Sequence, residues 1–312
     1  MPTSSVITVK NLRKTYGATV AVEDISFEVG EGEIFGMVGP NGAGKTTTIE
    51  CLEGLRRPDR GEMRVLGLDP VRQEHQLRLG IGTQLQQTSL PERLTVGEAL
   101  DLFASIYPHP ADWRALMEQL SLADKRNAYV SKLSGGQRQR LFIALALINS
   151  PRLVFLDELT TGVDPQARHA IWDLVRSICA QNKTVFLTTH LMEEAEQLCD
   201  RVAIVDHGRL VALDTPANLI RGLEAESRVV FTPDNGYSPE PLKALAGVSR
   251  VEKTGQRVVI YGQANGHDGH APLVAQIVTA LAAQNVHFTD LRTEQPNLED
   301  VFLSLTGRAM RD

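Results

Sequence analysis

The sequence lacks any apolar run long enough to cross a membrane. The longest run, Leu141–Ile148, falls far short of the roughly 20 residues that a spanning helix needs. Positive charge is not in excess either, because 32 Lys and Arg stand against 38 Asp and Glu, for a net charge of −6. This balance argues against a protein that grips nucleic acid by neutralising phosphates. The first residues show no basic segment followed by an apolar one, so we predict a cytosolic protein without a secretory signal.

Cysteine is scarce, and its spacing excludes two classes of small scaffold. Cys51, Cys179 and Cys199 are odd in number and form no C-x-x-C pair, so we expect reduced, mostly buried thiols rather than disulfides or zinc ligands. Hydrophobic residues make up 42% and charged residues 22% of the 312, as in ordinary globular proteins. The chain is therefore expected to fold, and its length favours two domains.

The larger part of the chain has the pattern of an α/β domain. Short β-branched runs alternate with longer amphipathic stretches between Ile34 and Ala212, which favours a largely parallel sheet. The expected strands are 34–38, 153–156, 184–188 and 202–205, with a helix from Pro165 between the second and third. Residues 6–35 alternate as antiparallel strands do, and residues 95–150 are helical in pattern.

The character of the sequence changes around residues 219–225. Residues 227–306 predict strand, helix, strand, strand, helix, strand, helix. The first six elements follow the split β-α-β order of a small ferredoxin-like α+β domain. We therefore place the first domain at 1–222 and a small accessory or regulatory domain at 223–312.

The strongest motif is Gly39-Pro40-Asn41-Gly42-Ala43-Gly44-Lys45-Thr46, a full match to G-x-x-x-x-G-K-[ST] between a strand and a helix. Its glycines let backbone N–H groups converge on phosphate oxygens, and the helix adds its positive end. Lys45 is expected to contact the β- and γ-phosphates, and Thr46 to ligate Mg²⁺. The spacing differs from that of G-x-G-x-x-G, which excludes a dinucleotide fingerprint. The motif predicts a nucleoside triphosphate site.

Two further segments carry chemistry. The apolar strand Leu153–Leu156 runs into Asp157 and Glu158, where a parallel sheet exposes its ligand-binding edge. Asp157 is expected to hold Mg²⁺ and Glu158 to polarise an attacking water, which favours hydrolysis. Leu133–Gln137, with the sequence L-S-G-G-Q, leads into a helix that Ser134 caps, and its glycines free backbone donors for an anion. Taken alone, this segment fits a well-capped helix equally well.

In this order, the motifs resemble those of the ATP-binding-cassette (ABC) ATPases over roughly residues 6–220. The resemblance implies that residues 1–222 form a phosphate-loop ATPase domain with an antiparallel β subdomain and a helical subdomain at about 87–150. It implies ATP and Mg²⁺ as cofactors. It also implies a head-to-tail homodimer with two ATP molecules between the subunits, in which Leu133–Gln137 is the signature motif that acts on the opposite subunit's nucleotide.

Other family positions have matches here. Tyr16 resembles the aromatic that stacks on adenine, although a half-buried aromatic at a strand end is the alternative. Gln86 resembles the glutamine that touches Mg²⁺ and the attacking water; its distance to Leu94 favours it, and Gln84 is the reserve. His190 resembles the switch histidine that contacts the γ-phosphate.

Two acidic segments have local interpretations, and the first of them has a family interpretation as well. Asp164 resembles the residue that couples the two sites, and it also suits the N-cap before Pro165. Behind His190, the acids Glu193, Glu194 and Glu196 are interpreted as first-turn residues favoured by the helix dipole.

These matches give a complete predicted site. The expected catalytic residues are Glu158, His190, Gln86 and Lys45. The residues expected to contact the nucleotide are Tyr16, Gly39, Asn41, Gly42, Ala43, Gly44, Lys45, Thr46, Thr47, Ser134, Gly135, Gly136, Gln137 and Asp164. The expected Mg²⁺ ligands are Thr46, Gln86 and Asp157. One departure from the family is Leu159, where a proline usually follows the two carboxylates; we expect altered loop rigidity and an active ATPase.

The tail indicates what the ATPase drives. Residues 296–308, like 160–165, resemble bacterial exporter ATPases of the daunorubicin-resistance type, and Leu298, Val301, Phe302 and Leu305 would share one helix face. The resemblance implies the energy-coupling subunit of a drug, antibiotic or lipid exporter, held at the cytoplasmic face of the membrane by an integral permease. An importer ATPase and a soluble ABC ATPase acting on ribosomes or nucleic acid are the alternatives. No direct contact with nucleic acid is expected.

Overall fold

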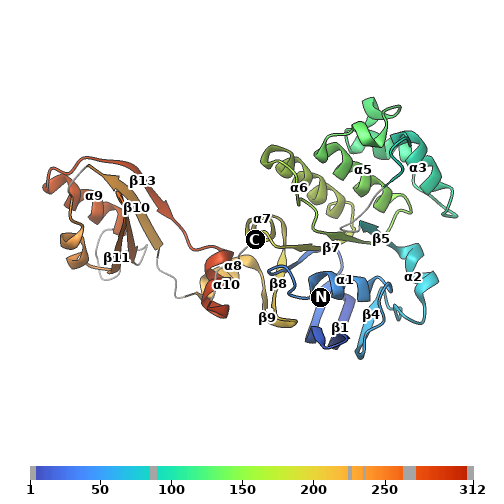
Figure 1. Ribbon diagram of the computed structural model, residues 1–312, viewed down its shortest axis with the longest axis horizontal. Coiled ribbons are helices and arrows are strands. Elements are labelled where there is room, and N and C mark those ends of the chain that lie inside the picture. Colours follow the sequence, from blue (N-terminus) through green and yellow to red (C-terminus); the bar gives the residue numbers. More distant parts are fainter. Residues whose placement is uncertain (1–4, 85–89, 224–226, 235–236, 263–271, 308–312) are drawn as a thin grey trace. The chain divides into compact units, whose positions relative to one another are not determined.

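The computed structural model describes residues 5–84, 90–223, 227–234, 237–262 and 272–307 (Figure 1). These residues fall into two compact units. The first comprises the chain up to Leu219 together with the residues after Ser304, and the second is Ile220–Ser304.

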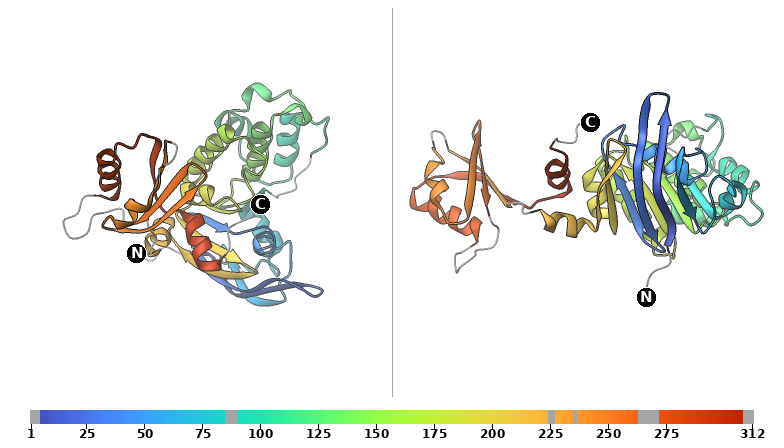
Figure 2. Two further views of the ribbon diagram at one scale, coloured as in Figure 1. Left: turned by 60° about the vertical axis from the view of Figure 1, so that its left-hand side comes forward. Right: turned by 90° about the horizontal axis from the view of Figure 1, so that it is seen from below.

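A mixed nine-stranded sheet forms the frame of the first unit, in the order β4-β1-β2-β9-β8-β3-β7-β6-β5. Its strands are β1 (Ser5–Tyr16), β2 (Thr19–Gly30), β3 (Ile34–Val38), β4 (Arg60–Val65), β5 (Ile81–Gln84), β6 (Leu153–Asp157), β7 (Thr184–Thr189), β8 (Arg201–Asp206) and β9 (Arg209–Asp214). The five strands from β8 to β5 are parallel to one another, and β4, β1 and β2 pair in antiparallel fashion. Both views in Figure 2 show the long β1–β2 hairpin in dark blue.

The sequence pattern explains the two halves of this sheet. Strands β3, β6 and β7 are buried on both faces and are almost continuously apolar, as parallel strands covered by helices are. Along β2, buried and exposed residues alternate over Glu23–Val29, as they do in an antiparallel strand with one wet face. The expected strands at these positions, and the predicted α/β class, are confirmed.

Helices connect and cover the strands of the first unit. They are α1 (Lys45–Leu52), α2 (Glu74–Gly80), α3 (Val96–Ala104), α4 (Trp113–Gln119), α5 (Gly135–Leu147), α6 (Pro165–Cys179), α7 (Met192–Leu198) and α8 (Pro216–Gly222), with short 3-10 turns η1 (Ala123–Lys125) and η2 (Val130–Lys132). The segment from α3 to α5, green in Figure 1, lies at the β5 side of the sheet. Capping boxes start both α3, at Thr95 with Glu98, and α5, at Ser134 with Gln137.

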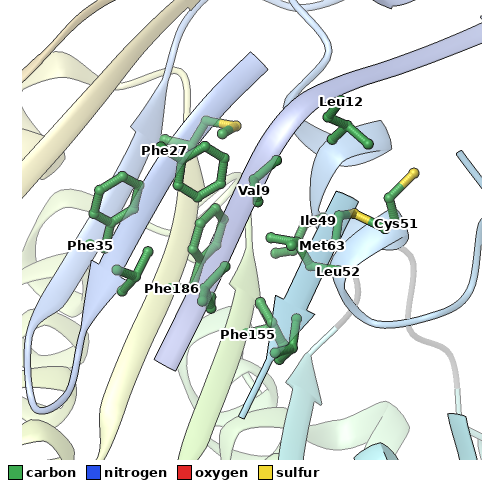
Figure 3. Packing of buried hydrophobic residues seen from close by; sticks show 14 of the residues in the cluster. Val9, Leu12, Phe27, Phe35, Ile49, Cys51, Leu52, Met63, Phe155 and Phe186 are labelled. Atoms are coloured by element: carbon green, nitrogen blue, oxygen red, sulfur yellow. The ribbon is translucent and has the colours of Figure 1, made fainter. Parts of the chain in front are cut away.

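One hydrophobic core joins the antiparallel strands, the parallel strands and α1. The rings of Phe27 and Phe35 stack at 5.4 Å between centroids, and Phe186 stacks on Phe35 at 5.5 Å. Figure 3 shows this aromatic stack beside Ile49 and Leu52 of α1. Because α1 starts at the phosphate loop, the core fixes the direction in which that loop points.

The second unit contains a four-stranded antiparallel sheet in the order β11-β12-β10-β13. Its elements are β10 (Ser227–Pro233), η3 (Glu240–Ala244), β11 (Val248–Thr254), β12 (Arg257–Gly262), α9 (Leu273–Ala283), β13 (Phe288–Glu294) and all but the last two residues of α10 (Leu298–Thr306). With β12 between β10 and β11, the order is that of a split β-α-β fold, as predicted. A core of its own surrounds Phe231, Ile260 and Ile277.

One local prediction for this part was wrong. The first expected helix is only the 3-10 turn η3, which stops at Leu245, where the backbone is extended. In α10, Leu298, Val301 and Phe302 are buried, and Leu305, near the end of the helix, is exposed. No helix among the described residues is both long and apolar enough to span a membrane.

Candidate nucleotide-binding site

The phosphate loop lies between the end of β3 and the start of α1, as the motif predicts. Two of its glycines are required by close backbone contacts. A Cβ on Gly39 would stand 2.1 Å from the Val205 carbonyl oxygen, and one on Gly44 would stand 2.4 Å from that of Ala21. Gly44 also has a φ of 101°, a left-handed conformation that side chains disfavour. The loop is thus pinned against β8 and β2.

Lys45 is the first residue of α1 and is only 4% exposed. Its ammonium donates hydrogen bonds to the carbonyl oxygens of Gly39, at 2.7 Å, and Pro40, at 3.0 Å. Burial lowers the pKa of Lys45, whereas the negative charges of Glu158 and Asp157 raise it. The Lys45 side chain therefore bends back into the phosphate loop, near the carboxylates of Asp157 and Glu158.

Asp157 ends β6 and is buried. It accepts one hydrogen bond from the hydroxyl of Thr188 and another from that of Thr46. Burial raises the pKa of Asp157, while the bond from Thr188 lowers it. Asp157 and Thr46 thus come from separate elements and meet. A carboxylate beside a hydroxyl is an oxygen donor set of the kind that Mg²⁺ prefers.

Glu158 follows directly and has an unusual backbone. Its φ is 50°, which places a non-glycine residue in the left-handed region. The turn is fixed by its N–H, which donates to the Thr188 carbonyl oxygen at 3.1 Å, while the Thr161 hydroxyl donates to its carboxylate at 3.2 Å. The carboxylate lies 3.7 Å from Nδ1 of His190, the residue after β7. An acid and a histidine therefore face each other beside the phosphate loop.

Tyr16, at the end of β1, is 42% exposed and lines a pocket together with loop residues and Glu158. The pocket lining includes Tyr16, Asn41, Gly42, Gly44, Lys45, Thr46, Thr47 and Glu158. The ammonium of Lys14 lies 5.4 Å from the centre of the Tyr16 ring. An exposed aromatic face on one wall and phosphate-binding groups on another suit a nucleotide.

The Leu133–Gln137 segment starts α5 and is built around its cap. Ser134 accepts from the N–H of Gln137 at 3.3 Å, and Gln137 accepts from the N–H of Ser134 at 3.0 Å. A Cβ on Gly136 would be 3.0 Å from Ala167 of α6. Asp164 is the N-cap of α6, accepting from the Ala167 N–H at 2.9 Å. The capping roles expected for Ser134 and Asp164 are confirmed.

One predicted site residue cannot be placed, since Gln86 lies outside the described residues. The reserve, Gln84, is the last residue of β5 and pairs with Leu156 of β6. It therefore stands at the same sheet edge as Asp157.

Sequence reasoning missed two residues. Thr188 holds both acidic residues: its hydroxyl donates to the Asp157 carboxylate, and its carbonyl oxygen accepts from the backbone N–H of Glu158. Glu194 is in the first turn of α7, as interpreted, but its contacts were not foreseen: it is 1% exposed and accepts hydrogen bonds from Thr160 and Trp172. Its spacing from Leu191 and Leu198 was the available signal, because it shares their helix face.

A buried acid near the site gives a pH prediction. Glu53 caps the C-terminus of α1, is 2% exposed, and has a pKa that burial raises to about 8 from 4.5. Because the folded pKa is above the unfolded one, this group favours the fold fully below pH 4.5, and that contribution is lost as the pH rises through about 8. Glu53→Gln should abolish the loss, which is at most about 5 kcal/mol.

Urea unfolding at pH 5 and pH 9 measures this effect. The variant should gain stability over the native chain only at the higher pH. An equal difference at both pH values would contradict the protonation of Glu53 in the fold.

The chain is similar to known proteins along nearly its whole length. A family model described as "ABC transporter" matches residues 22–161. The "Nod factor export ATP-binding protein I" of Ralstonia nicotianae is 40% identical, over 98% of this chain and 95% of its own. The protein of that name from Rhizobium etli is 39% identical, over 98% of this chain and 95% of its own. A structure titled "Structure of ATP binding subunit of ABC transporter" superposes with a TM-score of 0.63 and 30% identity, covering 70% of this chain and 92% of that one.

Proposed function

The chain belongs to the ATP-hydrolysing ATP-binding subunits of ABC transporters, and we propose that it powers an exporter through a separate membrane permease. The observation that carries the proposal is the extent of the similarity. Relatives named for export match nearly the whole chain, including the second unit and α10, and not only the ATPase core.

The site residues divide the work of hydrolysis. The phosphate loop and Lys45 bind the β- and γ-phosphates, and Tyr16 stacks on the base. Thr46 and Asp157 would hold Mg²⁺, which neutralises phosphate charge. The Glu158 carboxylate accepts the proton of the attacking water, and His190, 3.7 Å away, faces the γ-phosphate. Gln86 is proposed to assist at the metal and the water.

Two copies are proposed to enclose the nucleotides. Ser134 and Gly135 are exposed at the N-terminus of α5, where the backbone N–H groups of the two glycines and the helix dipole suit an anion. The nucleotide of the opposite subunit would supply that anion, with Asp164 at the junction between the two sites. ATP binding then closes the pair, and hydrolysis reopens it.

A groove beside the helical segment offers a contact surface for the permease, which would hold the chain at the cytoplasmic face of the membrane. Its lining includes Leu55, Phe103, Tyr107 and Phe142. Phe103 belongs to helix α3, on which Leu102 is exposed. Ile106, just after the end of α3, is exposed as well. Exposed apolar side chains next to an apolar groove mark a protein contact.

The proposed transported molecule is one that leaves the cell. The names of the relatives give Nod factor as an example. The test compares cells carrying the native gene with cells carrying Glu158→Gln. Untargeted mass spectrometry of medium and cell extract should find a compound that, in the variant, is depleted in the medium and accumulates in the cells. Unchanged distributions would contradict the proposal, and loss of a nutrient from the cells would indicate an importer.

A further inference from the structure

Glu194 is a buried carboxylate to which the catalytic scheme above gives no role. It lies in α7 and is 1% exposed, as fully enclosed as the apolar Ala195 beside it. A buried charge is costly unless it is hydrogen-bonded, so its partners show what it holds together. Those partners come from two other elements of the same unit.

A single oxygen of Glu194 accepts both hydrogen bonds. The Thr160 hydroxyl donates to Oε1 at 2.8 Å, and the Trp172 indole N–H donates to it at 3.0 Å. Thr160 belongs to the loop after β6, and Trp172 is a buried residue of α6. Glu194 therefore joins this loop and α6 to α7.

These bonds close a ring around the catalytic pair. Thr160 is two residues after Glu158, and Glu194 is four residues after His190. The ring runs from Glu158 along the chain to Thr160, across to Glu194, back along α7 to His190, and across 3.7 Å to Glu158. The distance between Glu158 and His190 is thus fixed by Thr160 and Glu194, which are not among the residues that line the pocket.

The loop needs such an anchor. Glu158 keeps a left-handed φ of 50°, and such strain persists only where neighbouring structure over-determines it. Of the two threonines that follow, Thr161 bonds the Glu158 carboxylate itself, and Thr160 bonds Glu194. Leu159, between Glu158 and Thr160, is fully buried.

From this ring we propose that Glu194 is a positioning residue for hydrolysis. Its hydrogen bonds with Thr160 and Trp172 attach these residues to α7 and so keep Glu158 and His190 at a fixed distance from each other. The inference rests on the proposed roles of Glu158 and His190. It predicts a defect in the chemical step and not in nucleotide affinity.

The test measures ATP turnover and ATP affinity of the full chain. Thr160→Val, which removes one hydrogen bond and keeps the side-chain shape, should lower kcat ~10- to 100-fold, with ATP affinity within about threefold of native. Glu194→Ala should do the same, and the double variant should be no slower than Glu194→Ala. Glu194→Gln keeps an acceptor oxygen and should restore most of kcat.

Glu193→Ala is the matched control, because Glu193 is exposed on the same helix, its nearest cation being Arg168 at 4.0 Å. It should behave as native. Unchanged kcat in Thr160→Val, or a parallel loss of kcat and ATP affinity in both Glu194 variants, would overturn the positioning role. If the native chain itself hydrolysed no ATP, the proposed function would fail first, so the two failures are distinguishable.

Discussion

Glu158→Gln is expected to lower ATP turnover at least ~100-fold while ATP affinity stays within about threefold of native. The amide keeps the size of the side chain and its contact with Thr161, but it cannot accept a proton from water. Turnover is measured by phosphate release and affinity by calorimetry. Because ATP then stays bound, the variant should also gain the mass of a dimer when ATP and Mg²⁺ are added.

The control for this variant is Glu193→Gln, the same chemical change at an exposed position of α7. It should leave turnover unchanged. Turnover of Glu158→Gln close to that of the native chain would show that another group accepts the proton.

Lys45→Ala is expected to abolish ATP binding at micromolar nucleotide. The native ammonium sits in the loop, bonded to the Gly39 and Pro40 carbonyl oxygens and ready to contact phosphate. Losing one partner of a buried, charge-assisted contact costs about 2–5 kcal/mol, which corresponds to a roughly 30- to 5,000-fold rise in Kd. Calorimetric titration with ATP measures the change.

Lys183→Ala provides the comparison. Lys183 is half-buried and, like Lys45, donates to a carbonyl oxygen, that of Pro151, at 3.0 Å, but it is not among the residues that line the nucleotide pocket. Its variant should bind ATP as the native chain does. An unchanged Kd in Lys45→Ala would exclude the phosphate loop as the binding site.

Most of the fold could be predicted because its signals are local. The strand at 34–38 was predicted to the residue, since a short apolar run ends at the glycine-rich loop. Ser134 could be predicted as an N-cap because a capping box involves only four consecutive residues. The 3-10 turn η3 was missed, because over five residues the side-chain pattern of a 3-10 turn does not differ from that of a short α-helix.

The site was harder to predict, because some of its contacts join residues far apart in the chain. Nothing near Thr188 in the sequence shows that its hydroxyl meets Asp157, which lies on the neighbouring strand. Glu194 looked like one of three helix-start acids, and only the packing of α7 against Thr160 and Trp172 distinguishes it. Family resemblance supplied Tyr16 and His190, for which residue spacing alone gives no role.

The most direct test of the account is to identify what the chain works with. The Glu158→Gln form is expressed in the cells from which the sequence comes, membranes are solubilised in detergent with ATP and Mg²⁺, and co-purifying proteins are identified by mass spectrometry. The account predicts a polytopic membrane protein with several apolar segments of about 20 residues each. Recovery of ribosomes, nucleic acid or soluble proteins alone would contradict it.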